Sequence, residues 1–129
     1  MNVEELFTLA LSFLSEKPQQ NDLRSFIIPW VNLLLTEALP YENSVRLKLG
    51  RQPKLESAPI LSDWQEEIPY CDDICRIAFP YGLASFIFQD DDNEYRTERY
   101  RNLYIAALQD AMKIQEEPIT DLYGGDTDG

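Results

Sequence analysis

The stretch "FPYGLASFIFQDDDNEYR", residues 79–96, places a strongly apolar run directly before three consecutive aspartates. The run belongs to a longer segment, Asp72–Gln89, whose hydrophobic residues cover nearly the whole circumference of a helix. We therefore predict that this segment is the central helix of the fold. Pro80 and Gly82 should bend it, because proline has no N–H to donate one turn back and glycine is about 1 kcal/mol less favourable than alanine inside a helix.

The aspartates themselves predict a tight corner between two helices. Asp91 and Glu94 have capping-box spacing, and carboxylates are stabilised at the positive end of a helix dipole. The helix that follows carries apolar residues at helical intervals from Tyr100 to Ile114 and should stop before Pro118. Capping explains the acidic cluster without a metal ion.

Two further helices are predicted upstream. Val3–Glu16 has apolar residues at near-helical spacing, with Asn2 available as its cap. A second helix should begin at Asn21 or Asp22 and run through Leu39, where Pro40 ends it. Pro29 lies inside this helix and should kink it.

Residues 40–70 predict a long loop, because four prolines punctuate them and no helical period persists. Within the loop, "SVRLKLG", residues 44–50, alternates apolar and basic residues as a short half-buried strand does, which would make a β-arm. The same part of the chain holds its only concentrated positive patch, which we take as the candidate subunit interface: Arg46, Lys48, Arg51 and Lys54.

These elements predict an all-α, four-helix bundle-like domain with kinked central helices and a long loop or short β-arm between helices 2 and 3. The domain should span residues 1–117, followed by a flexible acidic tail, 118–129. The bulky apolar residues of the tail make it a candidate docking segment: Ile119, Leu122 and Tyr123.

Composition narrows the function. The 129 residues include 23 acidic and 11 basic ones, a net charge of −12, which disfavours duplex DNA and anionic membranes and favours a basic partner. The N-terminal sequence lacks the features of a signal peptide, and no apolar run is long enough to span a bilayer, so we expect a cytoplasmic protein without a membrane segment.

The sequence assigns no catalytic, cofactor-binding or metal-binding residues. The chain has no histidine, and Cys71 and Cys75 would supply only half of a zinc site, so reduced and partly buried thiols are expected. Asp90, Asp92 and Glu94 superficially suggest a calcium loop, but its bend-forming glycine and distant bidentate glutamate are missing. We therefore expect neither an enzyme nor a cofactor.

Much of residues 22–112 resembles small phage and prophage proteins of Firmicutes from the head-morphogenesis region, of the head-tail connector or adaptor type. The resemblance lies in "WVNLLLTEALPYENSVR" (30–46), "LSDWQEEIPYCDDICRIAFPYGLASFIFQDDDN" (61–93) and "YRNLYIAAL" (100–108). Its most specific parts are Asp63–Tyr70, similar to a "DDEIPY"-like stretch, and "PYGLA" at Pro80–Ala84. Trp64 departs from it, since an acidic residue is expected there.

The resemblance implies a helical, non-enzymatic subunit that forms a homo-oligomeric ring beneath the portal and joins the DNA-filled head to the tail. Its partners would be further copies of itself, the portal protein and tail or stopper proteins, with DNA passing without specific binding. Assembly in the bacterial cytoplasm would leave it at the head-tail junction of the virion. The alternative from composition is an acidic DNA mimic that inhibits a basic host protein, and an enzyme with a carboxylate-bound metal is a third hypothesis.

Overall fold

The computed structural model describes residues 1–14, 20–50 and 52–114. Its elements are α1 (Val3–Leu11), α2 (Gln20–Leu49), a π-helical turn η1 (Ile74–Ala78), α3 (Phe79–Asp90) and α4 (Glu94–Ile114). Within these ranges there is no β-strand, and the predicted all-α, bundle-like fold is confirmed. No helix in the described part of the chain is both long and apolar enough to cross a membrane.

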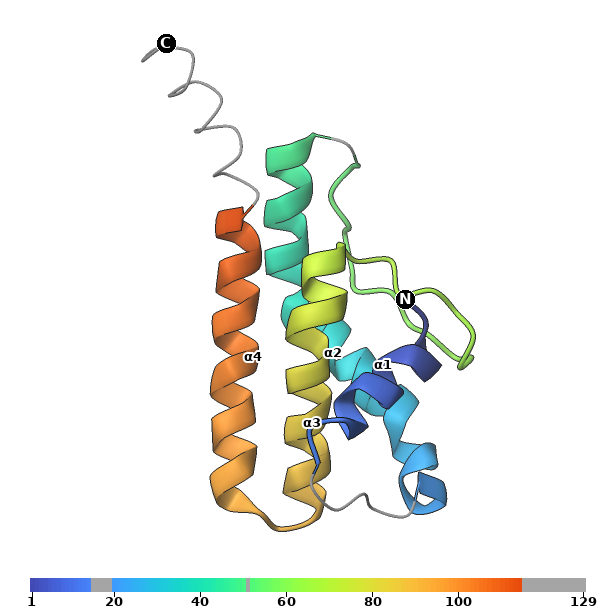
Figure 1. The fold of residues 1–129 in the computed structure, drawn as a ribbon. Helices are drawn as coiled ribbons and strands as arrows, with labels where there is room; N and C mark the ends of the chain where they lie inside the picture. The colour runs from blue at the N-terminus through green and yellow to red at the C-terminus, as the bar shows by residue number, and fades with distance from the viewer. Residues whose placement is uncertain (15–19, 51, 115–129) are drawn as a thin grey trace.

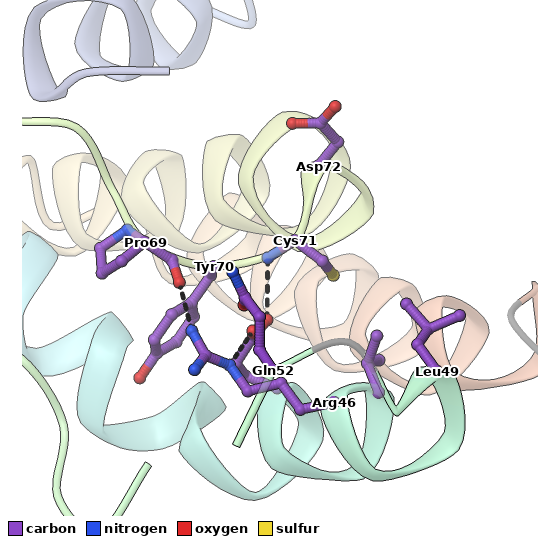
Figure 2. A pocket seen from close by; sticks show the side chains of 9 residues that line it. Arg46, Leu49, Gln52, Pro69, Tyr70, Cys71 and Asp72 are labelled. Atoms are coloured by element: carbon purple, nitrogen blue, oxygen red, sulfur yellow. Dashed lines mark hydrogen bonds and ion pairs between the residues drawn. The ribbon is translucent and has the colours of Figure 1, made fainter. Parts of the chain in front are cut away.

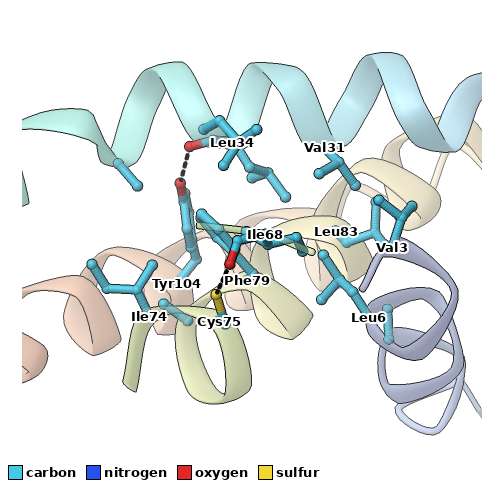
Figure 3. Close-up of a cluster of buried hydrophobic side chains, with 14 of the residues drawn as sticks. Val3, Leu6, Val31, Leu34, Ile68, Ile74, Cys75, Phe79, Leu83 and Tyr104 are labelled. Carbon is cyan, nitrogen blue, oxygen red and sulfur yellow. Dashed lines mark hydrogen bonds between the residues drawn. The ribbon is translucent and has the colours of Figure 1, made fainter. Parts of the chain in front are cut away.

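Helix α3 is the centre of the domain, as the sequence predicted. Figure 1 shows it beside α4 and packed against α1 and α2, and all three helices contact it. The side chains that meet around it are fully or almost fully buried, and Figure 3 shows part of this cluster. Among the largest of them are Tyr104, Phe7, Phe79, Leu34 and Leu83.

Gly82 lets three helices come close together. A Cβ atom at this position would lie 2.7 Å from Leu34 Cδ2 and 3.0 Å from Tyr104 Cδ1, so any side chain here would force the Leu34 side chain to shift. The Tyr104 hydroxyl also donates a hydrogen bond of 3.5 Å to the Leu34 carbonyl oxygen, which links α4 to α2 across the core (Figure 3).

Pro80 is accommodated by the π-helical turn η1 that precedes α3. The Phe79 N–H bonds the Ile74 carbonyl oxygen, five residues back, instead of the usual four. Because proline has no N–H and its ring crowds the carbonyl one turn back, this wider turn gives the backbone room at the point where an α-helix would be strained. The predicted distortion at Pro80 therefore takes the form of an inserted residue in the helical turn.

The corner between α3 and α4 is present, but Asn93 rather than Asp91 caps α4. Asn93 Oδ1 accepts a hydrogen bond of 3.1 Å from Arg96 N, and its carbonyl oxygen accepts Thr97 N at 2.9 Å. Asp91 instead ends α3, and Asp92 turns the chain with a φ of 55°, a conformation that aspartate tolerates. The capping prediction was therefore wrong in position, and one acidic residue serves the turn.

The prediction that α2 ends at Pro40 was wrong, and so was the predicted strand at residues 45–49. Helix α2 continues through both Pro29 and Pro40 to Leu49. Both prolines are exposed, as are Ser25 and Thr36, whose carbonyls lose their helical donors, so water can replace the missing bonds. Figure 1 shows the axis of α2 changing direction between its two halves.

The long loop is therefore shorter than predicted, and its described part, residues 52–71, is held along α2 by side chains. The Asn43 amide donates to Leu55 O at 2.9 Å and accepts from Leu55 N at 2.8 Å. The Asn32 amide makes the same pair with Leu61, at 3.0 and 2.8 Å. Each asparagine thus replaces a strand partner and satisfies both polar backbone groups of one loop residue.

The N-terminus is fixed by the same loop. Asn2 caps α1 in a capping box with Glu5, as the sequence indicated, and forms an isolated β-bridge with Glu67. The Met1 ammonium group lies 3.1 Å from Glu67 Oε1, and Met1 O accepts Ile68 N at 2.9 Å. The loop therefore joins α1 to α2.

Candidate functional site

Arg46, the first member of the predicted basic patch, is buried and does not belong to the surface. Since α2 continues past Pro40, Arg46 lies one helical turn after Glu42, and its Nε donates to Glu42 Oε2 at 2.7 Å. Its Nη1 donates to Pro53 O at 3.0 Å and its Nη2 to Pro69 O at 2.9 Å. One guanidinium group thus holds both ends of the loop on α2, so Arg46 is used within the domain and is not displayed on an exposed basic patch.

Glu42 completes this clamp from the acidic side. Its side chain is 2% exposed, and its Oε1 accepts a hydrogen bond of 2.8 Å from Cys71 N, at the point where the loop enters the helical turn before η1. The carboxylate therefore lies between the guanidinium group of Arg46 and this backbone N–H. A buried ion pair is tolerated only where further hydrogen bonds satisfy both groups, and here they do.

The other members of the basic patch are not gathered around Arg46. Lys48 and Lys54 are exposed, and Lys48 Nζ lies 3.4 Å from Met112 O, so it links the last turn of α2 to α4. Arg51 lies outside the described residues. The patch predicted from four neighbouring positions is therefore divided between a buried clamp and the surface.

A cavity of about 500 Å³ opens beside the clamp, lined by residues of α2 and of both ends of the loop (Figure 2). Burial raises the pKa of the Cys71 thiol at its edge to about 11 and the pKa of the deeper Cys75 thiol to about 12. Burial also raises the pKa of the neighbouring Tyr70, whose hydroxyl donates to Leu35 O at 2.6 Å. All three groups are protonated at neutral pH, and both cysteines are unpaired thiols, as predicted.

No cluster of three or more His, Cys, Asp or Glu side chains that could hold a metal ion occurs in the described part of the chain. The acidic corner, Asp90–Asp92, is exposed and is accounted for by the turn and the helix end. The candidate docking segment of Ile119, Leu122 and Tyr123 lies outside the described residues.

The sequence did not predict an exposed apolar surface on the N-terminal half of α2. We call it the α2 stripe, and it consists of Phe26, Pro29, Trp30 and Leu33. Phe26 is 46% exposed and Leu33 53% exposed. The Trp30 ring stacks on Phe26 at 5.6 Å and on Phe86 of α3 at 5.9 Å between ring centroids.

The spacing of the α2 stripe was the signal that could have found it. Positions 26, 29, 30 and 33 lie on one side of a helix with 3.6 residues per turn. Apolar residues all around a segment predict burial on every side, but the neighbouring helices cover only part of α2. Which part stays uncovered depends on the packing.

No protein-family model, curated protein or solved structure matches this chain. The chain is thus placed as an all-α, bundle-like protein by its own structure. Its function has to be inferred from its surface and from the resemblance in its sequence.

Proposed function

We propose that this protein is a non-enzymatic structural subunit of a phage head-tail connector, which forms a ring under the portal and joins the DNA-filled capsid to the tail. The sequence resemblance over residues 30–46, 61–93 and 100–108 supports this class of protein. The ring would assemble in the bacterial cytoplasm from copies of this chain and would contact the portal protein and tail or stopper proteins at the head-tail junction.

The observation that carries the proposal is the α2 stripe. A chain with a net charge of −12 places phenylalanine, tryptophan and leucine side chains together on an accessible helix face, and contiguous apolar patches of this kind are typical of protein interfaces. Aromatic residues are enriched in such contacts because they bury a large area with few rotatable bonds. The stripe is therefore our candidate for one side of the subunit interface.

The rigid attachment of the loop also fits a structural subunit. Asn32, Asn43 and Arg46 hold the backbone of residues 52–71 on α2 and so fix the exposed Ile60, which is 82% accessible, relative to the helices. Ring closure needs subunits with a reproducible shape, because a heterologous interface closes only at a fixed rotation. The net negative charge would in turn repel DNA that passes through the ring.

The test is light scattering after size exclusion, with the protein alone and mixed with the portal protein encoded nearby. We expect a ring that co-migrates with the portal, and Leu33→Glu should abolish the ring because it places a charge in the apolar contact. Ser25→Glu is the matched control, since Ser25 is an exposed polar residue on the same helix. Circular dichroism would verify that both variants keep their helices.

Two results would overturn the proposal. One is a protein that never associates with portal, and the other is Leu33→Glu and Ser25→Glu variants that associate as well as the unchanged chain does. If the protein ignored portal but competed with DNA for a basic protein, the DNA-mimic alternative would replace the connector.

A further inference from the structure

Two adjoining hollows lie on the first half of α4 and together form what we call the α4 groove. One has a volume of about 410 Å³ and the other about 490 Å³, and Tyr95 and Arg99 line both. The remaining described residues of the first hollow are Ser12, Phe13, Leu14, Arg96 and Tyr100, and those of the second are Glu98, Asn102 and Leu103.

The α4 groove has unpaired positive charge. Four described arginines are held by carboxylates: Arg24 by Glu4, Arg46 by Glu42, Arg76 by Asp72 and Arg101 by Glu37. By contrast, Arg96 and Arg99 have no ion pair within the described residues, and no carboxylate lines the first hollow there. In a chain with a net charge of −12, these two guanidinium groups are available for an anionic group from outside.

The floor of the α4 groove is aromatic and well packed. Phe13 stacks on Tyr81 at 5.1 Å, and Tyr100 stacks on Phe88 at 5.2 Å. Arg96 lies over the Phe88 ring at 5.5 Å, a cation–π contact that orients the guanidinium without using its hydrogen-bond donors.

The second hollow supplies an apolar rim. Tyr95 is 74% exposed, and Leu103 is half-buried two turns further along the same face of α4. Arginines that can bind a carboxylate beside an exposed aromatic ring suit an acidic peptide that also carries aliphatic or aromatic side chains.

We propose that the α4 groove binds the segment "EEPITDLY", residues 116–123, of a second copy of this chain. The segment has both required features, since it carries Glu116, Glu117 and Asp121 beside Ile119, Leu122 and Tyr123. Asp121 would contact the two arginines, and the apolar side chains would pack against Tyr95 and Leu103. This inference rests on the proposed function, because it supplies a contact between neighbouring subunits of the ring.

Chain length favours a second copy over the same copy as the source of the segment. Arg96 precedes Ile114, the last residue of α4, by 18 positions, which is about 27 Å at a rise of 1.5 Å per residue. Asp121 follows Ile114 by seven positions and can reach at most about 24 Å from it, even fully extended and without the reversal that folding back along α4 requires. The same copy could join Asp121 to Arg96 only with an almost fully extended segment and the added length of both side chains, whereas a second copy has no such constraint.

The experiment is a binding titration of a fluorescein-labelled synthetic peptide of residues 115–129 with the full-length protein, followed by fluorescence anisotropy. We expect saturable binding that weakens as salt is added, because the carboxylates and guanidinium groups are partly solvated. Arg99→Glu should weaken binding about tenfold or more, since it replaces attraction by repulsion. Tyr95→Ala should weaken it without changing the salt dependence.

Arg76→Glu is the matched control. Arg76 is an exposed arginine that does not line the α4 groove, and it is paired with Asp72 at 3.9 Å. Equal loss of binding in Arg76→Glu and Arg99→Glu would mean that the peptide senses only the overall charge, and that result overturns the inference. Absence of saturable binding would overturn it as well. If a ring forms on the portal but the peptide does not bind, the proposed function stands and only the α4 groove contact is refuted. If the peptide binds but no ring forms on the portal, the α4 groove contact stands and the proposed function is refuted.

Discussion

Replacing Arg46 by alanine should destabilise the domain more than any other single change to the predicted basic patch. The substitution removes the Nε hydrogen bond to Glu42 and the two Nη bonds to Pro53 O and Pro69 O, and it leaves a 2% exposed carboxylate without its counter-charge. Breaking a buried ion pair by removing one partner costs about 3–5 kcal/mol. Since a domain of this kind has about 5–15 kcal/mol of total stability, the variant should be close to unfolding.

The assay is urea denaturation followed by circular dichroism, with thermal melting as a second readout. A domain of 129 residues loses about 3–5 °C in Tm per kcal/mol of stability, so we expect Tm to fall by about 10–25 °C. The double variant Glu42→Met, Arg46→Met should recover part of this loss, because no charge is then left buried, and the cycle should show a coupling energy above about 2 kcal/mol. Lys54→Ala, at an exposed position of the same predicted patch, is the control and should change stability by less than about 0.5 kcal/mol. A loss below about 1 kcal/mol for Arg46→Ala, or strictly additive single and double variants, would refute the clamp.

Three further predictions follow from the core and the helix ends. Gly82→Ala should destabilise the domain by a net of about 1–2 kcal/mol in urea denaturation, because overpacking costs about 1–3 kcal/mol and outweighs the gain in helix propensity. A more stable variant would show that the Leu34 side chain moves aside. Asn93→Ala should cost about 1 kcal/mol in the same assay and Asp91→Ala much less, and the reverse order would return the capping role to Asp91. In a Cys75→Ala background, Cys71 should react with an aromatic disulfide reagent at pH 8 about tenfold more slowly than a cysteine in a short peptide. With a pKa of about 11, the fraction of Cys71 present as thiolate at pH 8 is about a hundredfold lower than for a thiol of ordinary pKa, and the greater nucleophilicity of that thiolate offsets part of the loss. A rate equal to that of the peptide would contradict the burial of Cys71.

The parts of the fold that the sequence predicted are those fixed by local chemistry. Apolar residues around the full circumference of residues 72–89 indicated a buried helix, and α3 is that helix together with η1. Asn2 was correctly predicted as a cap because a capping box needs only residues three positions apart. At the corner between α3 and α4, each of the four polar residues 90–93 could serve as a cap, and only the path of the turn selects Asn93.

Pro40 shows why the rest could not be predicted. A proline inside a helix costs about 3 kcal/mol or more in isolation, and residues 45–49 alternate like a strand, so both local signals favoured an end to the helix. The structure keeps the helix because Val45 and Arg46 are buried against the loop, and burial over a further two turns outweighs one missing hydrogen bond at an exposed position. Such packing involves residues more than twenty positions away, and local patterns do not report it.

This error decided which residues were taken as the candidate interface. As a strand, residues 45–49 would have turned Arg46 and Lys48 to one exposed side, whereas a helix turns Arg46 toward Glu42 and Lys48 toward α4. Of the predicted patch, Arg46 is therefore buried, and among the described residues the arginines without a carboxylate partner lie on α4, where Arg96 and Arg99 had been assigned no role. A basic side chain indicates a binding surface only when no carboxylate of the same domain already pairs with it. Which basic residues are paired in this way depends on the tertiary structure.

The α2 stripe and the α4 groove are two different surfaces, and their positions matter for a ring. At the level of residues 26–33 and 95–103, Figure 1 shows α2 and α4 on opposite sides of α3. A symmetric dimer would need one self-complementary patch, but a ring needs two unlike patches that face away from each other. The groove is cationic and therefore not complementary to a second copy of itself, and the apolar stripe is a surface of a different kind. If Leu33→Glu and Arg99→Glu each block assembly but a mixture of the two variants forms portal-independent pairs, each variant has supplied the surface that the other lacks, and the stripe and the groove lie on the two opposite faces that meet at one head-to-tail junction.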